Sequence, residues 1–418
     1  MSQLGWIDFS SKDRELVKQA LAMLTEPGTL DELGIGQIRD AFSDVLFPGI
    51  STIQTRAKYF ITVPRIFRDY QALQPAHKKK YTNLENYLRI QENTVAQILN
   101  EAHDENEFGI IGRTRLTSGG VDRRPSVIYW SGLRILGLVK TQLSLRDFCR
   151  QLDNSASSEA LIDSALSEGS DDLDYMKGRP LVSLPDYSEK WKEKGNLDLR
   201  LTCKEAEFLK GRFVETPAIA SSVPAQLFKH GLVENVLKEN ENSEVTAFDL
   251  LVDVLKTSAV VDLTCQSYLK VAQEFSLAME GPHLRYNILL SQNGYPECVK
   301  KYEAEYGQWL EKVNRLNLFD ANSSARWLEF ASRDKRRRIK ERSQQFVRGC
   351  CEYFQGSNPV SQLDDLVFKQ AIDNKGQRSW LKRGLEKEQW LGIRRLEYRW
   401  GSAKNIIRDI QVGLNAST

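Results

Sequence analysis

Apolar residues recur along most of the chain at spacings of three and four positions, which is the period of an amphipathic α-helix. Runs of strict two-residue alternation, which would indicate β-strands, are few and short. The pattern therefore predicts a mainly α, multi-helical protein. Beyond residue 70 the expected helices are Leu84–Ala102, Ser144–Leu152, Leu201–Phe213, Ala247–Lys256, Leu263–Met279, Pro296–Arg315 and one long helix over Ser323–Phe354. Thr202 and Glu205 have the spacing of a capping box at the start of Leu201–Phe213.

The stretch from Leu33 to Arg68 predicts two consecutive amphipathic helices. Pro48 and Gly49 would end the first. Ser51 with Gln54 has the spacing of a capping box, so the second helix is expected to begin there. Both helices carry an unusual density of charged and hydroxyl-bearing side chains on the faces that are not apolar.

Two of those charges are carboxylates one helical turn apart, a spacing at which they can share a divalent cation. Basic and phenolic side chains that follow closely in the sequence can bind a phosphate. The candidate catalytic residues are Asp40, Asp44, Arg56, Lys58 and Tyr59. The alternative, which we favour, is that Asp40 or Asp44 forms an ion pair with Arg39, Arg56 or Lys58 and holds two helices together.

Four blocks of the sequence resemble an uncharacterised bacterial family known only as a domain of unknown function. The blocks are LGWIDFS at Leu4–Ser10, Leu33–Phe60, Arg124–Gly137 and Leu201–Phe213, and with the closing WLGIRRLEYRWGSAKNIIRDIQVGL the likeness runs nearly end to end. Lys58 stands where a second arginine is expected. The resemblance implies a prokaryotic cytoplasmic protein encoded beside helicases, methyltransferases and phospholipase-D-like nucleases that defend against foreign DNA. It implies no activity.

A Gly- and Arg-rich connection over residues 109–124 precedes a helix that can begin at Pro125. Its backbone N–H groups and the N-terminal dipole of that helix can hold a phosphate. An ordinary glycine turn with a short hairpin, as in a winged-helix-like unit, explains the same residues. The phosphate-binding candidates are Arg113, Arg115, Ser118, Arg123 and Arg124.

The net charge of +2 conceals an asymmetry. Residues 151–175 contain no Lys or Arg among many acids and serines, and we expect an acidic linker there. It would separate an N-terminal helical domain, 1–150, from a larger helical region, 176–418. From residue 331 onward there are 19 Lys and Arg against 10 Asp and Glu.

This basic end interleaves cations with Trp380, Trp390, Tyr398 and Trp400, a mixture that stacks bases and neutralises phosphates. It could equally dock against the acidic part of the same chain, and core packing explains some of the aromatic residues. The candidate nucleic-acid-binding residues are Arg336, Arg337, Arg338, Lys340, Arg342, Lys382, Arg383, Arg394 and Arg395.

Known catalytic motifs are absent from the sequence. His77-Lys78-Lys79 begins like the HxK(x4)D signature of phospholipase-D-like nucleases, but Leu84 stands where the Asp should be. No Walker, GxSxG or HExxH motif occurs, and the six scattered cysteines do not form a zinc knuckle. No apolar run approaches the ~20 residues that span a bilayer, and residues 1–10 do not resemble a signal peptide.

We therefore expect a cytoplasmic, non-enzymatic protein that needs no cofactor or metal and contacts no membrane. Its expected partners are nucleic acid, with DNA favoured, and helicase or nuclease subunits of a bacterial DNA-defence system. Two alternatives stay open. One is an enzyme that acts on a phosphate-containing substrate through Asp40, Asp44 and Arg56, and the other is a scaffold whose basic end docks an acidic protein.

Overall fold

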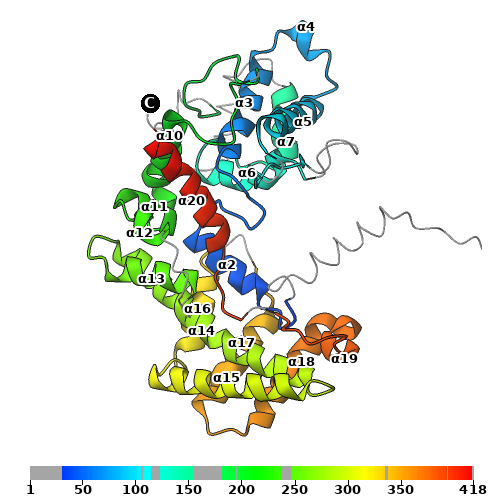
Figure 1. The fold of residues 1–418 in the computed structure, drawn as a ribbon, viewed down its shortest axis with the longest axis vertical. Coiled ribbons are helices and arrows are strands. Elements are labelled where there is room, and N and C mark those ends of the chain that lie inside the picture. The colour runs from blue at the N-terminus through cyan, green and yellow to red at the C-terminus, as the bar shows by residue number, and fades with distance from the viewer. Residues whose placement is uncertain are drawn as a thin grey trace, which may run out of the picture. The chain divides into compact units, whose positions relative to one another are not determined.

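The computed structural model is helical, as predicted (Figure 1), and no β-strand occurs among the residues that it describes. An isolated antiparallel bridge joins Val139 to Val182. The described residues are 31–104, 107–113, 123–154, 181–193, 195–237, 246–334, 338–392 and 394–416. Among them, no helix combines the length and the apolar character needed to cross a membrane.

The chain forms two compact units, and neither is a single stretch of sequence. Unit 1 comprises residues 1–43 and 267–398, and unit 2 comprises residues 44–266 and 399–418. Both the expected N-terminal domain and the expected C-terminal region therefore contribute residues to each unit. Of the acidic linker, residues 151–154 lie in a helix, and 155–175 lie outside the described residues.

Unit 2 is built from short and medium-length helices that join distant parts of the sequence (Figure 1). The C-terminal helix α20 packs on α10, and α3 packs on α5 and α6. The helices are α3 (Tyr59–Ala72), α4 (Pro75–Lys78), α5 (Leu84–Ala102), α6 (Pro125–Ile135), α7 (Leu145–Asn154), α10 (Cys203–Glu215), α11 (Val223–Lys229), α12 (Val233–Leu237), α13 (Ala247–Thr257) and α20 (Trp400–Asn415), with a 3-10 turn η2 at Pro217–Ile219.

Unit 1 is organised around an aromatic core. The ring of Phe42 lies 4.9 Å from that of Phe275, 4.5 Å from that of Phe330 and 5.7 Å from that of Tyr398. Its helices are α15 (Pro296–Arg315), α16 (Ser323–Ala331), α17 (Glu341–Gln355), α18 (Val360–Lys375) and α19 (Trp380–Arg383), with a 3-10 turn η3 at Gly376–Arg378. Two of the three unit boundaries fall within α2 (Gly36–Leu46) and within α14 (Leu263–Ser291), and the third lies between Tyr398 and Arg399.

The second helix of the Leu33–Arg68 stretch begins at Tyr59, so the prediction that it begins at Ser51 is wrong. Only one half of the capping box is present: the Gln54 side chain accepts a hydrogen bond from the Ser51 amide at 3.3 Å, whereas the Gln54 amide donates to the Ser51 carbonyl and not to its hydroxyl. The following amides are bound by distant side chains instead: the Tyr129 hydroxyl accepts from Thr55 N at 2.9 Å and from Arg56 N at 3.1 Å. A helix from Ser51 would have to give up these bonds.

The long helix predicted over Ser323–Phe354 is also wrong, since α16 ends at Ala331 and α17 begins at Glu341. Ser332 ends α16, and its side chain donates to the Leu328 carbonyl at 2.8 Å. Residues 333–340 are all charged except Ile339. A helix continued through them would have no apolar face to pack, and its like charges one turn apart would repel. Ile339, the one apolar residue in that run, is buried.

Two glycines allow the LFPG segment after α2 and the GLR segment of α6 to lie against each other. Gly49 has a φ of +78°, which glycine adopts at little cost, and it ends the loop after α2. A Cβ atom on Gly132 of α6 would lie 2.4 Å from the Gly49 carbonyl oxygen and 2.6 Å from the Phe60 ring. The backbones of α6 and of this loop can approach so closely only without a side chain at residue 132.

Replacement of Gly132 by alanine should therefore destabilise unit 2 by about 2 kcal/mol, because overpacking in a rigid site forces the backbone to shift. Urea unfolding of Gly132→Ala against wild type measures this change. Gly211→Ala is the matched control, since Gly211 lies inside α10 with its nearest neighbour for a Cβ at 3.7 Å. The control should be neutral or stabilising, and equal stability of the two variants would contradict the close-approach explanation.

Candidate functional site

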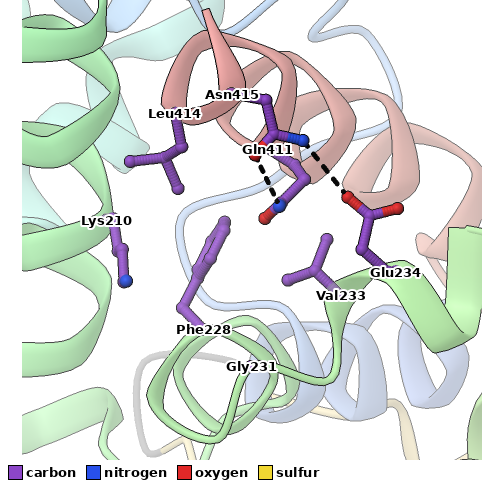
Figure 2. A pocket seen from close by; sticks show the side chains of 8 residues that line it. All are labelled: Lys210, Phe228, Gly231, Val233, Glu234, Gln411, Leu414 and Asn415. Carbon is purple, nitrogen blue, oxygen red and sulfur yellow. Dashed lines mark hydrogen bonds between the residues drawn. The ribbon is translucent and has the colours of Figure 1, made fainter.

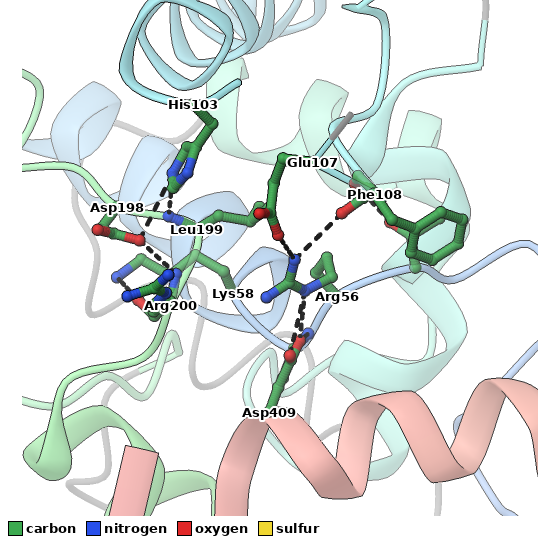
Figure 3. A network of polar contacts seen from close by, with 12 residues as sticks. Arg56, Lys58, His103, Glu107, Phe108, Asp198, Leu199, Arg200 and Asp409 are labelled. Carbon is green, nitrogen blue, oxygen red and sulfur yellow. Dashed lines mark hydrogen bonds and ion pairs between the residues drawn. The ribbon is translucent and has the colours of Figure 1, made fainter. Parts of the chain in front are cut away.

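The strongest concentration of charge in unit 2 surrounds Arg56, in the segment that leads into α3 (Figure 3). Its Nε donates to both oxygens of Asp409 on α20, at 3.1 and 3.0 Å, and its Nη1 donates to Glu107 at 2.7 Å. Asp409 also accepts from the Ala57 amide at 2.8 Å. Burial by itself would lower the pKa of Arg56, but the two carboxylates hold that pKa above its ordinary value.

A second cluster consists of Lys58, Arg65 and Glu205 and is almost completely buried. Glu205 accepts from Lys58 Nζ at 2.7 Å through one oxygen and from Arg65 Nη2 at 2.8 Å through the other. It also completes the predicted capping box of α10, because Thr202 N donates to it at 2.9 Å. Burial would raise the pKa of Glu205, but Lys58 and Arg65 lower it below the usual value.

The Arg65 guanidinium lies over two rings, 4.9 Å from the centre of Tyr187 and 5.7 Å from that of Trp191. Such stacking supports a cation where water is excluded. Beside these residues, His103 accepts at Nε2 from the Leu199 amide at 3.2 Å (Figure 3). Taken together, the carboxylates of Glu107, Glu205 and Asp409 have short contacts with cations and amides from other segments of unit 2.

The candidate catalytic residues do not converge on one point. Asp40 pairs with its neighbour Arg39 at 3.0 Å, which confirms one of the predicted pairings, but both residues belong to α2, so this ion pair does not hold two helices together. Asp44 pairs instead with Arg399, directly before α20. Tyr59 accepts from the Ile111 amide at 2.8 Å, and burial raises the pKa of its hydroxyl to about 12. Among the described residues, no group of three His, Cys, Asp or Glu side chains is placed to hold a metal ion.

The N-terminus of α6, which the sequence offers as a phosphate-binding position, is occupied by a side chain of the protein. Glu92 of α5 is 1% exposed and accepts from the Ser126 amide at 2.6 Å. Arg113 is bound to Asn100 at 2.8 Å and to the Glu107 carbonyl at 2.8 Å, and Arg124 contacts the Glu85 carbonyl at 3.5 Å. Arg123 is exposed. Arg115 and Ser118 lie outside the described residues, as does most of the predicted hairpin.

A pocket of about 270 Å³ lies in the same unit, between α10, α11, α12 and α20 (Figure 2). Its apolar surface comes from Phe228, Val233 and Leu414. At its rim, the Asn415 amide donates to Glu234 at 3.5 Å, and Gln411 donates to Asn415 at 3.4 Å. The pocket contains none of the residues that the sequence singled out.

The candidate nucleic-acid-binding residues divide into two groups in unit 1. Arg338, Lys340, Arg342, Lys382 and Arg383 are exposed, whereas Arg336 and Arg337 lie outside the described residues. Arg394 pairs with Glu305 at 2.8 Å, and Arg395 is largely buried with Ser276 and Glu280. Tyr398 and Trp400 are buried in the cores of units 1 and 2, and only Trp380 and Trp390 are partly exposed.

The exposed group converges on residues 31–37. Lys340 N donates to Gln37 at 3.0 Å, and Asn374 at the end of α18 donates to the Asp31 carbonyl at 2.7 Å. Ser379, the N-cap of α19, donates to the buried Glu32 at 3.1 Å, and Arg342 donates to the Asp373 carbonyl. We call this the basic surface; it consists of Arg338, Lys340, Arg342, Lys375, Arg378, Lys382 and Arg383.

Sequence reasoning missed the partners of the charged residues Asp44, Arg56 and Lys58. Asp409, Glu205 and Arg399 come from segments that are 100 to 400 residues away, and nothing in the local pattern marks them. Glu205 was identified as a helix cap, which accounts for only one of its contacts. A buried Glu92 was not expected either, because its position on α5 reads as part of a polar face.

Comparison with known protein families gives one match, which covers the N-terminal part of the chain. Residues 1–178 match a family of unknown function, DUF6361. The search of curated proteins and the search of solved structures gave no match. The acids that pair with Arg56, Lys58 and Arg65 lie after residue 178, apart from Glu107, so the matched residues are completed by later parts of unit 2.

Removal of the Glu205 charge should leave two buried cations without their counter-ion. We expect Glu205→Gln to lower the free energy of unfolding by roughly 3 kcal/mol, the cost typical of breaking a buried pair from one side. Chemical denaturation of the variant measures the loss. Glu207→Gln, an exposed carboxylate on the same helix, is the control and should change little; a similar small effect for both would show that Glu205 is not the anchor.

Glu92 should make stability depend on pH near neutrality. Burial raises its pKa to about 7 from an ordinary value near 4.5, against the effect of the Ser126 hydrogen bonds and Arg124. Between those values the folded protein holds a proton that the unfolded chain releases. Stability should therefore fall as the pH rises from about 5 through about 7. Thermal melts of Glu92→Gln should lack this slope.

The control for that series is Glu101→Gln, which removes an exposed carboxylate from the same helix. It should keep the wild-type pH dependence. A Glu92→Gln variant whose melting temperature follows the wild-type curve at every pH would show that Glu92 does not titrate in this range.

Proposed function

We propose that this protein binds nucleic acid, with DNA favoured over RNA, through the basic surface of unit 1. We further propose that it is a non-enzymatic accessory subunit of a bacterial DNA-defence system that works beside helicase or nuclease subunits. The role in defence follows from the family resemblance of the sequence. The binding surface follows from the described geometry of unit 1.

The observation that carries the proposal is the excess of exposed cations around residues 31–37. The segments 338–342 and 373–383 contain seven Lys and Arg and two acids, Glu341 and Asp373. Six of the seven cations are exposed, and Lys375 is half-buried. The acids in this segment have other partners: Asp31 accepts from the Ile35 and Gly36 amides at the start of α2, and the buried Glu32 accepts from Tyr286 and Ser379.

The fixed position of α19 supports the proposal in addition to the charge. Glu32 accepts from the Tyr286 hydroxyl at 3.0 Å and from Trp380 N at 3.3 Å, so α19 is fixed at its first residue. The Arg383 guanidinium lies 4.7 Å from the centre of the partly exposed Trp380 ring. An arginine held on an indole beside further cations suits a phosphate backbone with an adjacent base.

The experiment is a salt titration of DNA binding by fluorescence anisotropy. Lys382→Glu/Arg383→Glu should weaken binding at least tenfold near 0.1 M salt and reduce the slope of log affinity against log salt by about 1.8, because each phosphate contact contributes about 0.9. Arg394→Glu/Arg395→Glu is not suitable as a comparison, because both arginines have intramolecular partners.

The matched control is Lys312→Glu/Arg315→Glu, which changes the net charge equally at exposed positions near the end of α15. It should retain most of the affinity. If the two double variants lose affinity equally, or if the Lys382/Arg383 variant binds DNA as wild type does, the basic surface is not the binding site. Tight binding of an acidic polypeptide in place of DNA would favour the scaffold alternative.

A further inference from the structure

The run HKKKY at residues 77–81 is a second concentration of positive charge, and it belongs to unit 2. It spans the end of the short helix α4 and the turn that leads to α5. His77, Lys79 and Lys80 are exposed, and Lys78 and Tyr81 are half-buried. We call residues 77–81 the lysine turn.

Local contacts hold the turn in one conformation. The Lys79, Lys80 and Tyr81 amides donate to carbonyls three or four residues earlier, at 3.0 to 3.3 Å. Lys78 Nζ lies 5.1 Å from the centre of the Tyr70 ring, and the Tyr81 ring meets the Tyr87 ring edge-on at 4.8 Å. The exposed lysines therefore extend from a supported backbone, which lowers the entropic cost of binding a ligand.

Among the described residues, two acids that belong to or contact the neighbouring α5 are already used for other contacts. Asp153 accepts from the Tyr70 hydroxyl at 2.6 Å and from the Leu84 amide at 3.0 and 3.1 Å, and so caps α5. Glu85 lies 4.0 Å from Arg146. Within the described residues, no ion pair joins Lys79 or Lys80 to a carboxylate. Their charge is thus available to an external anion.

The composition of the turn favours a phosphate backbone over a lipid surface. Membrane-binding segments place large apolar side chains beside their cations. No large apolar side chain is exposed among residues 71–83; the exposed ones on either side of this range in the sequence are Ile53 and Ile90. Lysine binds phosphate as a mobile point charge, and a half-exposed tyrosine alongside offers a stacking face.

We propose that the lysine turn is a second nucleic-acid contact, so that the chain binds phosphates with both units. The proposal rests on the proposed function and extends it to a surface that uses different residues. Two linked contacts strengthen binding to a long ligand more than either alone, provided the ligand reaches both.

Anisotropy titrations with a long duplex and a long single strand test this proposal. Lys79→Glu/Lys80→Glu should weaken binding about tenfold and reduce the salt slope by about 1.8 on duplex or about 1.4 on single strands, at 0.9 or 0.7 for each phosphate. Combined with Lys382→Glu/Arg383→Glu, the losses should exceed those of either pair. Lys204→Glu/Lys229→Glu, two exposed lysines on α10 and α11, is the control with equal charge change.

One outcome is that the Lys79/Lys80 variant binds DNA as well as this control does while the Lys382/Arg383 variant binds it weakly. That result would overturn the second contact and leave the proposed function intact. The reverse result would support the lysine turn and refute the basic surface. Absence of DNA binding by the wild-type chain would refute both. A Lys79/Lys80 variant that loses affinity for polyglutamate but not for DNA would identify the turn as a protein-docking site instead and would also overturn the proposal.

Discussion

The bond between Arg56 and Asp409 determines how unit 2 is assembled. Asp409 binds the guanidinium and the neighbouring Ala57 amide, so it fixes both the side chain and the backbone of the segment before α3. Because that segment is not helical, α3 begins at Tyr59, and Lys58 and Arg65 reach Glu205. A charge left without its partner in this buried setting would be costly, so these pairings restrict the unit to one arrangement.

Much of the helical structure could be predicted because it depends on local patterns. The predicted ranges Leu84–Ala102 and Pro296–Arg315 are the observed bounds of α5 and α15, and the capping box at Thr202 and Glu205 is present. Periodicity and capping act over a few residues, so a single sequence contains the information. The errors occur where distant groups compete, as at residues 51–58, whose amides bind Tyr129 and Asp409.

The candidate site was less accessible to sequence reasoning. Residue types identified Asp40, Asp44 and Arg56 as chemically capable, but their partners depend on which segments the fold brings together. The aromatic residues of the basic end show the same limit. Trp380 is partly exposed beside Arg383, whereas Trp400, in a similar sequence context, lies in the core against Phe47.

The long separation between Arg56 and Asp409 also affects how the chain folds as it is made. The two residues are 353 positions apart, so at the usual rate of protein synthesis roughly 20–70 s pass between their appearances. During that interval Arg56 lacks Asp409, one of its two carboxylate partners, and the surface of α10 that α20 covers is exposed once α10 has been made. Unit 2 can therefore reach its final form only after α20 has been synthesised, so this unit is completed at a late stage of translation.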